Sequence, residues 1–141
     1  MRVVVDTNIF VSAIMGTQSA SREIIRLCLK GELQPLMGNA LLAEYEDVCS
    51  RADLFDDTIL SLDGRTVLLD AFLASCQWTP IYYLWRPNLR DEGDNHIIEL
   101  AVAGGASIII TANIRDFAKP ALVFPGLDVC TASEFLARRR H

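Results

Sequence analysis

The sequence has few of the residues that disulfide-stapled or zinc-binding domains depend on. It contains 4 cysteines and 2 histidines among 141 residues, and no two cysteines form a CxxC pair. This spacing predicts neither a disulfide framework nor a zinc site. We expect no export signal at the N-terminus, reduced thiols and a cytoplasmic location.

Glycine, proline and long apolar runs are also scarce. With 8 Gly, 5 Pro and 51% hydrophobic residues, the composition excludes collagen-like repeats and long disordered linkers. The most apolar stretch, 97–112, contains Glu99 and is shorter than the ~20 apolar residues that a bilayer span needs. We expect one domain over residues 1–141 and no membrane association.

Positive charge is in deficit. There are 13 Lys and Arg residues against 18 Asp and Glu, which gives a net charge of -5. Such a surface does not attract nucleic acid by itself, so the charge disfavours a protein that only coats DNA or RNA. An enzyme whose bound cations contact the phosphates is compatible with it.

Strand-like and helix-like segments alternate along the chain. The β-branched run Arg2–Val5 is typical of a strand that is buried on both faces. The alternation predicts an α/β fold with a mostly parallel sheet and helices on both of its faces. Further strands are expected at 33–37, 78–84, 107–110 and 127–130, and helices at 7–15, 19–30, 39–49 (capped by Asn39), 53–77, 94–103 and after Thr131.

Acidic and amide side chains follow two of the predicted strands. Asp6 comes directly after the first strand, and Thr111, Asn113 and Asp116 follow the strand at 107–110. In open parallel sheets, ligands bind beyond the carboxyl ends of the strands. The spacing therefore predicts that these side chains meet at one edge of the sheet. The alternative is that Asp6 only caps the helix that follows it.

Two helices supply further candidate acids. Asp94 shares a stripe with Ile97 and so points toward the core, where an unpaired carboxylate is costly. On the helix at 39–49, Glu44 and Glu46 flank the apolar arc on opposite sides, and periodicity alone does not choose between them. Each acid also has a simpler interpretation: Asp94 as a favourable helix start and Glu44 as a solvated flank residue.

Carboxylates that gather in one crevice repel one another unless a cation joins them. Oxygen ligands without organised His or Cys favour Mg²⁺ or Mn²⁺ over zinc, and Mg²⁺ combines one or two carboxylates with waters and phosphate oxygens. Such an ion lowers the pKa of a bound water and stabilises charge on a phosphate. The predicted chemistry is hydrolysis of phosphodiester bonds.

Four short motifs, in this order, resemble those of the PIN domain family, most of all the toxins (VapC-like ribonucleases) of bacterial toxin–antitoxin systems. They lie between Met1 and Phe117 and are spread over most of the chain's length. The motifs are Val3-Val4-Val5-Asp6-Thr7-Asn8, Leu41-Leu42-Ala43-Glu44-Tyr45, Asp91-Glu92-Gly93-Asp94-Asn95 with Leu100-Ala101, and Thr111-Ala112-Asn113 with Asp116-Phe117.

The resemblance implies a three-layer α/β/α Rossmann-like sandwich and a Mg²⁺- or Mn²⁺-dependent endoribonuclease that leaves a 5′-phosphate and a 3′-hydroxyl. By motif position, Asp6, Glu44 and Asp94 are the first three acids, so the register selects Glu44 over Glu46. Asn8 and Thr111 are expected to orient a ligand or a water. The resemblance also implies RNA as substrate, a homodimer, and a protein antitoxin as partner.

The fourth acidic position departs from the family pattern. Many relatives have an acid two residues after the threonine, where this chain has Asn113, and Asp116 follows three residues later. Asn113 still offers an amide oxygen, and Asp116 supplies a charge if its loop turns inward. The predicted catalytic residues are the acids Asp6, Glu44, Asp94 and Asp116, and the predicted metal ligands are these four with Asn113. The number of ions is left open.

The few basic residues indicate where RNA phosphates bind. Arg86 and Arg90 flank the predicted crevice and Arg115 lies in the strand-end loop, so these three are the candidate phosphate contacts. His96 lies within the acidic segment, where a single histidine is expected at the surface or beside a ligand.

Two other function classes are compatible with parts of the sequence. Asn113 favours a catalytically impaired PIN-fold module that binds RNA or a partner. An Asp after the first strand is also typical of haloacid-dehalogenase-like enzymes, but these have a second Asp two residues later, where this chain has Asn8. No GxxxxGK[ST], GxGxxG or GxSxG motif is present.

Overall fold

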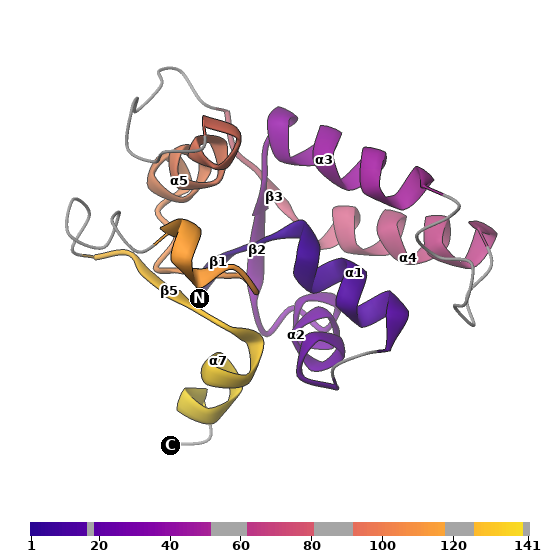
Figure 1. Cartoon of the computed structure of the whole chain (residues 1–141), viewed down its shortest axis with the longest axis horizontal. Coiled ribbons are helices and arrows are strands. Elements are labelled where there is room, and N and C mark those ends of the chain that lie inside the picture. The colour runs from indigo at the N-terminus through magenta and orange to yellow at the C-terminus, as the bar shows by residue number, and fades with distance from the viewer. Residues whose placement is uncertain (17–18, 52–61, 81–91, 118–125, 140–141) are drawn as a thin grey trace.

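A parallel sheet forms the centre of the computed structural model, which describes residues 1–16, 19–51, 62–80, 92–117 and 126–139 (Figure 1). Within these residues the sheet has 5 strands in the order β3-β2-β1-β4-β5, and every neighbouring pair is parallel. The strands are β1 (Arg2–Val5), β2 (Gln34–Met37), β3 (Gln77–Trp78), β4 (Ile108–Ile110) and β5 (Asp128–Cys130).

Helices cover both faces of this sheet. Figure 1 shows α1 to α4 on one side of β2 and α5 on the other. The predicted α/β/α layering with a parallel sheet is confirmed. The helices are α1 (Thr7–Met15), α2 (Ser19–Leu29), α3 (Asn39–Ser50), α4 (Leu62–Ser75), α5 (Glu92–Gly104) and α7 (Ala132–Arg139), and a 3-10 helix, η2 (Ile114–Phe117), follows β4.

The strand order creates a switch point between β1 and β4. The chain moves from β1 to β2 and β3 in one direction, and then returns through α5 to β4 on the other side of β1. Connections that leave two neighbouring strands in opposite directions open a crevice at the carboxyl ends of those strands. The residues that follow β1 and β4 therefore lie at this crevice.

The core explains why β1 is β-branched and uninterrupted. Val3, Val4 and Val5 are at most 1% exposed, because helices cover both faces of the strand. On the side of α1, the rings of Phe10, Tyr45 and Phe72 pack with centroids 5.4 to 5.5 Å apart and join α1, α3 and α4.

Two glycines allow α5 to pack closely and then stop. A Cβ at Gly104 would collide with the end of the Leu36 side chain, so a glycine here lets the end of α5 approach β2 without displacing that buried side chain. Gly105 then adopts a φ of 69°, which reverses the chain into β4. On the same helix, Ile97, Ile98 and Ala101 are 0% exposed.

Several element boundaries differ from the sequence predictions. The cap of α3 is Gly38 rather than Asn39, which is the first helical residue. The strand predicted at 78–84 begins at Gln77, and its residues 81–84 lie outside the described part of the chain, as do residues 53–61 of the helix predicted at 53–77. Of the helices described, none has the length and apolar character required to cross a bilayer.

Candidate active site

Asp6 lies where β1 ends and α1 begins. Its backbone N–H donates to the Ile110 carbonyl oxygen at 3.0 Å and so extends the pairing of β1 with β4. Oδ1 accepts the Thr7 N–H at 2.8 Å at the start of α1, whereas Oδ2 accepts the Thr111 hydroxyl at 2.8 Å and the Asn8 amide at 3.2 Å. Helix capping therefore accounts for only one of the two carboxylate oxygens.

Asn8 and Thr111 complete a polar network around this carboxylate. Asn8 Nδ2 also donates to Thr111 Oγ1 at 3.3 Å, and Asn8 Oδ1 accepts the Ala112 N–H at 3.1 Å. The Asn113 N–H donates to Thr111 Oγ1 at 3.0 Å. The bonds between the two strand ends join residues 103 to 105 positions apart, so only the folded sheet assembles them. They fix the orientation of the Asp6 carboxylate.

The Asp6 carboxyl lies in an unfavourable position for a charge. It is only 7% exposed. Burial raises the pKa of Asp6 above its ordinary value of 3.8, and the hydrogen bonds from Thr111 and Thr7, together with the electrostatic effect of His96, counteract the increase only in part. A cation beside this carboxylate would stabilise its ionised form.

A hydrogen bond from Tyr45 connects α3 to the end of β1. Its hydroxyl donates to the Val5 carbonyl oxygen at 2.7 Å, and its ring is fully packed in the core. The neighbouring Glu44 is partly buried, whereas Glu46 is exposed. The structure therefore brings Glu44, and not Glu46, toward the carboxyl ends of the strands. Helical periodicity alone did not distinguish the two glutamates.

His96, on the first half of α5, links the two acids. Its Nε2 lies 3.4 Å from Glu44 Oε2, and it interacts electrostatically with Asp6. From the sequence, His96 was expected at the surface or beside a ligand, and it was assigned no role. The sequence did contain a signal for its inward position: His96 lies four residues before Leu100, a core residue on the same helix, and residues four apart share a helix face.

The remaining candidates divide into those that the structure describes and those that it does not. Asn113 and Arg115 are exposed directly after β4. Asp94 lies in the first turn of α5 and Asp116 within η2, but their side chains are outside the described set, and Arg86 and Arg90 are outside it entirely. Within that set, no three His, Cys, Asp or Glu side chains form a metal-binding group.

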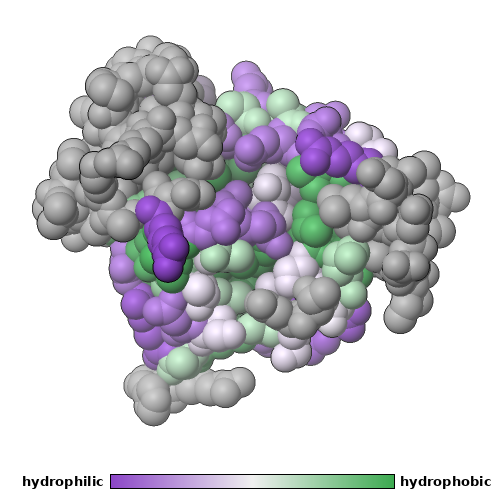
Figure 2. Space-filling view, viewed as in Figure 1, coloured by the Kyte–Doolittle hydropathy of each residue, from purple (hydrophilic) through white to green (hydrophobic). Residues whose placement is uncertain are grey.

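Hydrophilic residues gather in the middle of the face in view, near the meeting of β1 and α1 (Figure 2).

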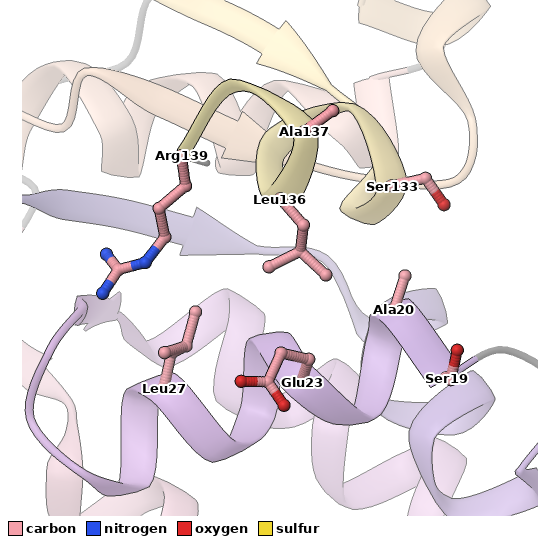
Figure 3. Close-up of a pocket in the computed structure, with 8 residues that line it drawn as sticks. All are labelled: Ser19, Ala20, Glu23, Leu27, Ser133, Leu136, Ala137 and Arg139. Atoms are coloured by element: carbon pink, nitrogen blue, oxygen red, sulfur yellow. The ribbon is translucent and has the colours of Figure 1, made fainter. Parts of the chain in front are cut away.

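A separate cavity of about 520 Å³ lies between α2 and α7 (Figure 3). Its walls combine Leu27 and Leu136 with the charged groups of Glu23 and Arg139. Arg139 is paired at 2.9 Å with Glu32, which precedes β2 at the amino end of the sheet. Among the described residues that line this cavity, none is a predicted site residue.

Comparison with known proteins agrees with this geometry. A family model for the PIN domain matches residues 2–115. The chain belongs to the PIN domain family. A chain in the crystal structure of VapBC2 from Rickettsia felis bound to a DNA fragment from their promoter is similar in fold, with a TM-score of 0.62, 21% identity, and 92% of this chain and 97% of that chain covered. No curated protein sequence gives a match.

PIN domains are generally nucleases that use divalent metal ions. The matched stretch of this PIN domain includes Asp6, Glu44, Asp94 and Asn113, whereas Asp116 lies one residue beyond it. Its described donors at the strand ends are carboxylate, amide and hydroxyl oxygens, which suit a hard cation. The buried carboxylate of Asp6 also fits such an ion, because a cation would offset the cost of keeping this charge away from water.

Proposed function

We propose that this PIN domain is a metal-dependent endoribonuclease that hydrolyses RNA phosphodiester bonds. The observation that carries the proposal is the buried Asp6 carboxylate, which is oriented by Asn8 and Thr111 at the crevice where Glu44 also approaches. Burying and orienting an acid in this way costs stability, so the arrangement favours a functional role over a structural one.

The proposed metal ligands are Asp6, Glu44 and Asp94, with Asn113 or Asp116 at the fourth position. Mg²⁺ or Mn²⁺ suits this oxygen donor set, and a bound ion would supply an activated water and stabilise charge on the scissile phosphate. The protein's own contribution is positional: Thr111 and Asn8 hold the Asp6 carboxylate, and Tyr45 holds α3 so that Glu44 stays beside His96.

Arginines near the strand ends are the proposed contacts to RNA phosphates. Arg115 is exposed two residues after Asn113, which places its backbone beside the crevice. Arg86 and Arg90, which precede the acidic motif in the sequence, are proposed as further phosphate contacts. The acidic crevice needs such cations because the net charge of -5 otherwise repels RNA.

The proposal extends to the whole chain and to its partners. We treat residues 1–141 as one PIN-like domain, because β5 pairs with β4 and α7 packs against α2, both beyond the matched family stretch. From the resemblance of its motifs to those of PIN-domain toxins, we further propose a toxin that acts on RNA in the cytoplasm, forms a homodimer and is held by a protein antitoxin, and the family match is consistent with this role.

An RNA cleavage assay tests the central proposal. The wild type is incubated with single-stranded RNA in Mg²⁺, in Mn²⁺ and in chelator, beside Asp6→Ala and the control Glu46→Gln. We expect cleavage only with metal, its loss in Asp6→Ala, and products with 5′-phosphate ends. Glu46→Gln removes an exposed acid from the same helix as Glu44, so it should cleave as the wild type does. Cleavage that persists in chelator or in Asp6→Ala contradicts the assignment.

Asn113 supports a second candidate, a PIN domain that binds RNA or a partner without cleaving it. An exposed amide stands where many relatives have an acid, so the site has one charge fewer to hold an ion. Calorimetric titration with Mn²⁺ separates the two candidates. Saturable binding favours the nuclease, and its absence at millimolar Mn²⁺ favours the binding module.

A further inference from the structure

A cavity of about 380 Å³ opens beside the proposed active site, where β2 and β3 end. Gly38 and Asn39 contribute the start of α3, Trp78 and Thr79 follow from β3, and His96 and Glu99 project from α5. The volume is within the range of pockets that bind small ligands or parts of larger ones. Because His96 also lies 3.4 Å from Glu44, the cavity adjoins the acidic crevice directly.

The walls of this cavity combine an aromatic surface with a buried acid. Trp78 is 49% exposed, although large aromatic side chains are usually well buried. Glu99 is only 3% exposed, on a helix whose neighbouring residues are apolar core. Exposed aromatic rings next to a phosphodiester-cleaving centre are suited to stack on unpaired bases of single-stranded RNA.

The start of α3 adds hydrogen-bond donors to the same cavity. The first turn of an α-helix has backbone N–H groups without partners inside the helix. At α3 the cap is Gly38, and no side chain of the described residues bonds to these groups. A ligand in the cavity therefore meets a carboxylate acceptor from Glu99 and backbone donors from α3.

We propose that this cavity binds one base of the RNA and prefers guanine. This inference rests on the proposed nuclease function and adds its base specificity. Guanine is the base whose Watson–Crick edge has two adjacent donors, N1–H and N2–H, beside the acceptor O6. The two donors match the Glu99 carboxylate, and O6 matches the backbone donors of α3. Adenine and cytosine place a ring-nitrogen acceptor beside their amine, and uracil places its N–H between two carbonyl oxygens, so each would direct an acceptor at the acid.

Ligand-observed NMR titrations test the inference without catalysis. The full chain is titrated in chelator with GMP, AMP, CMP and UMP, each as the 5′-monophosphate. We expect GMP to bind about 5- to 100-fold more tightly than the other three, the equivalent of roughly 1–3 kcal/mol for one bidentate base contact. Trp78→Ala should weaken all four nucleotides by about 5- to 100-fold, because it removes the stacking surface.

Matched variants separate recognition from folding. Glu99→Gln should reduce the preference for GMP to about twofold or less, while Glu46→Gln makes the same chemical change on an exposed part of α3 and should preserve it. Val67→Ala, at a side chain 68% exposed on α4, is the control for Trp78→Ala. Circular dichroism checks that each variant is folded. If Glu99→Gln is unfolded, the wild-type preference and Trp78→Ala decide the question.

The results distinguish this inference from the proposed function. Equal binding of the four nucleotides by the wild type, or unchanged binding by Trp78→Ala, overturns the guanine pocket even if RNA is cleaved with Mg²⁺. A clear preference for GMP without cleavage of any RNA overturns the nuclease proposal and leaves the pocket supported. If both hold, cleavage sites mapped on a mixed-sequence RNA should lie at a fixed offset from guanine.

Discussion

Polar groups at the carboxyl ends of β1 and β4, the functional edge of the sheet, are organised differently from those around α7. At this edge, Asp6 and Thr111 are 7% and 0% exposed, and their hydrogen bond joins residues 105 positions apart. At α7, the Glu134 N–H donates to Thr131 Oγ1 at 3.1 Å and the Thr131 N–H donates to Glu134 Oε1 at 3.0 Å, three positions apart. The second arrangement is a capping box, which a helix needs in order to begin.

The contrast shows how a functional acid differs from a structural one. The capping box satisfies backbone groups near the surface, and its carboxylate remains solvated. The Asp6 carboxylate is buried beyond what capping α1 requires, since only Oδ1 serves the helix. A carboxylate buried in this way is stabilised most by a cation, which is the reason to assign function to the edge and not to α7.

The largest expected effect is the loss of cleavage when the buried acid is neutralised. Asp6→Asn should reduce Mg²⁺-dependent RNA cleavage at least about 100-fold, because metal stabilisation of transition-state charge amounts to several kcal/mol. Glu134→Gln, the same chemical change in the capping box, should leave the rate within about twofold. Initial rates at saturating Mg²⁺ measure both variants, and comparable losses in the two would abolish the distinction between the regions.

Asp94→Asn should give a loss of the same size at the third proposed acid. Here the apo fold is expected to be as stable as the wild type or more stable, because one charge that repels the other acids is removed. Urea unfolding in chelator measures the stability, and the cleavage assay measures the rate. Retained cleavage in this variant would remove Asp94 from the proposed site.

The two threonines give the next comparison. Thr111→Val should lower the free energy of unfolding by about 2 kcal/mol, because a buried carboxylate loses a hydrogen bond. Thr131→Val should cost about 1 kcal/mol, as the loss of a helix cap does. Only Thr111→Val is expected to slow RNA cleavage, since only this hydroxyl orients Asp6. Urea denaturation provides the stabilities, and equal cleavage rates in the two variants would argue against the orienting role.

The pH dependence of stability provides a smaller effect with a defined sign. Burial raises the pKa of Asp6 in the folded protein, so the native state holds this proton more tightly than the unfolded chain does. The resulting stability is complete below the ordinary value of 3.8 and is lost as the pH rises through the folded pKa. In chelator, Asp6→Asn should therefore gain stability relative to the wild type as the pH rises above 3.8 and through the folded pKa of Asp6. Urea unfolding in chelator at a series of pH values measures the difference.

Local patterns in the sequence predicted most of the fold. The bounds Arg2–Val5 and Thr7–Met15 are as expected, because a β-branched run and helical spacing are both local signals. Pro35 lies within the strand predicted at 33–37 and pairs with Val3 in β2. Its missing N–H is tolerated because the pairing of β2 with β3 begins only at Leu36, one residue later.

The site was less accessible to sequence reasoning because its geometry depends on contacts across the sheet. Periodicity left Glu44 and Glu46 equivalent, and the family motif rather than the helix pattern separated them. The structure adds the cause, since Tyr45 bonds to the Val5 carbonyl and thereby sets the rotation of α3. His96 was not selected, because its position against Glu44 requires α3 and α5 to meet around the sheet edge.

The smallest expected effect concerns the exposed ion pair between Arg139 and Glu32. Their side chains are 39% and 47% exposed, so water and salt screen a pair whose atoms lie 2.9 Å apart. Arg139→Ala should lower the free energy of unfolding by at most about 0.5 kcal/mol at low salt and by less at high salt. Leu136→Ala, at a partly buried position of the same helix, should cost more because it loses apolar contacts. Urea denaturation at both salt concentrations checks the order of the two variants. A salt-independent loss above about 1 kcal/mol for Arg139→Ala would mean that the polar groups around α7 are as strongly organised as those around Asp6, and burial would no longer separate the functional edge from the structural one.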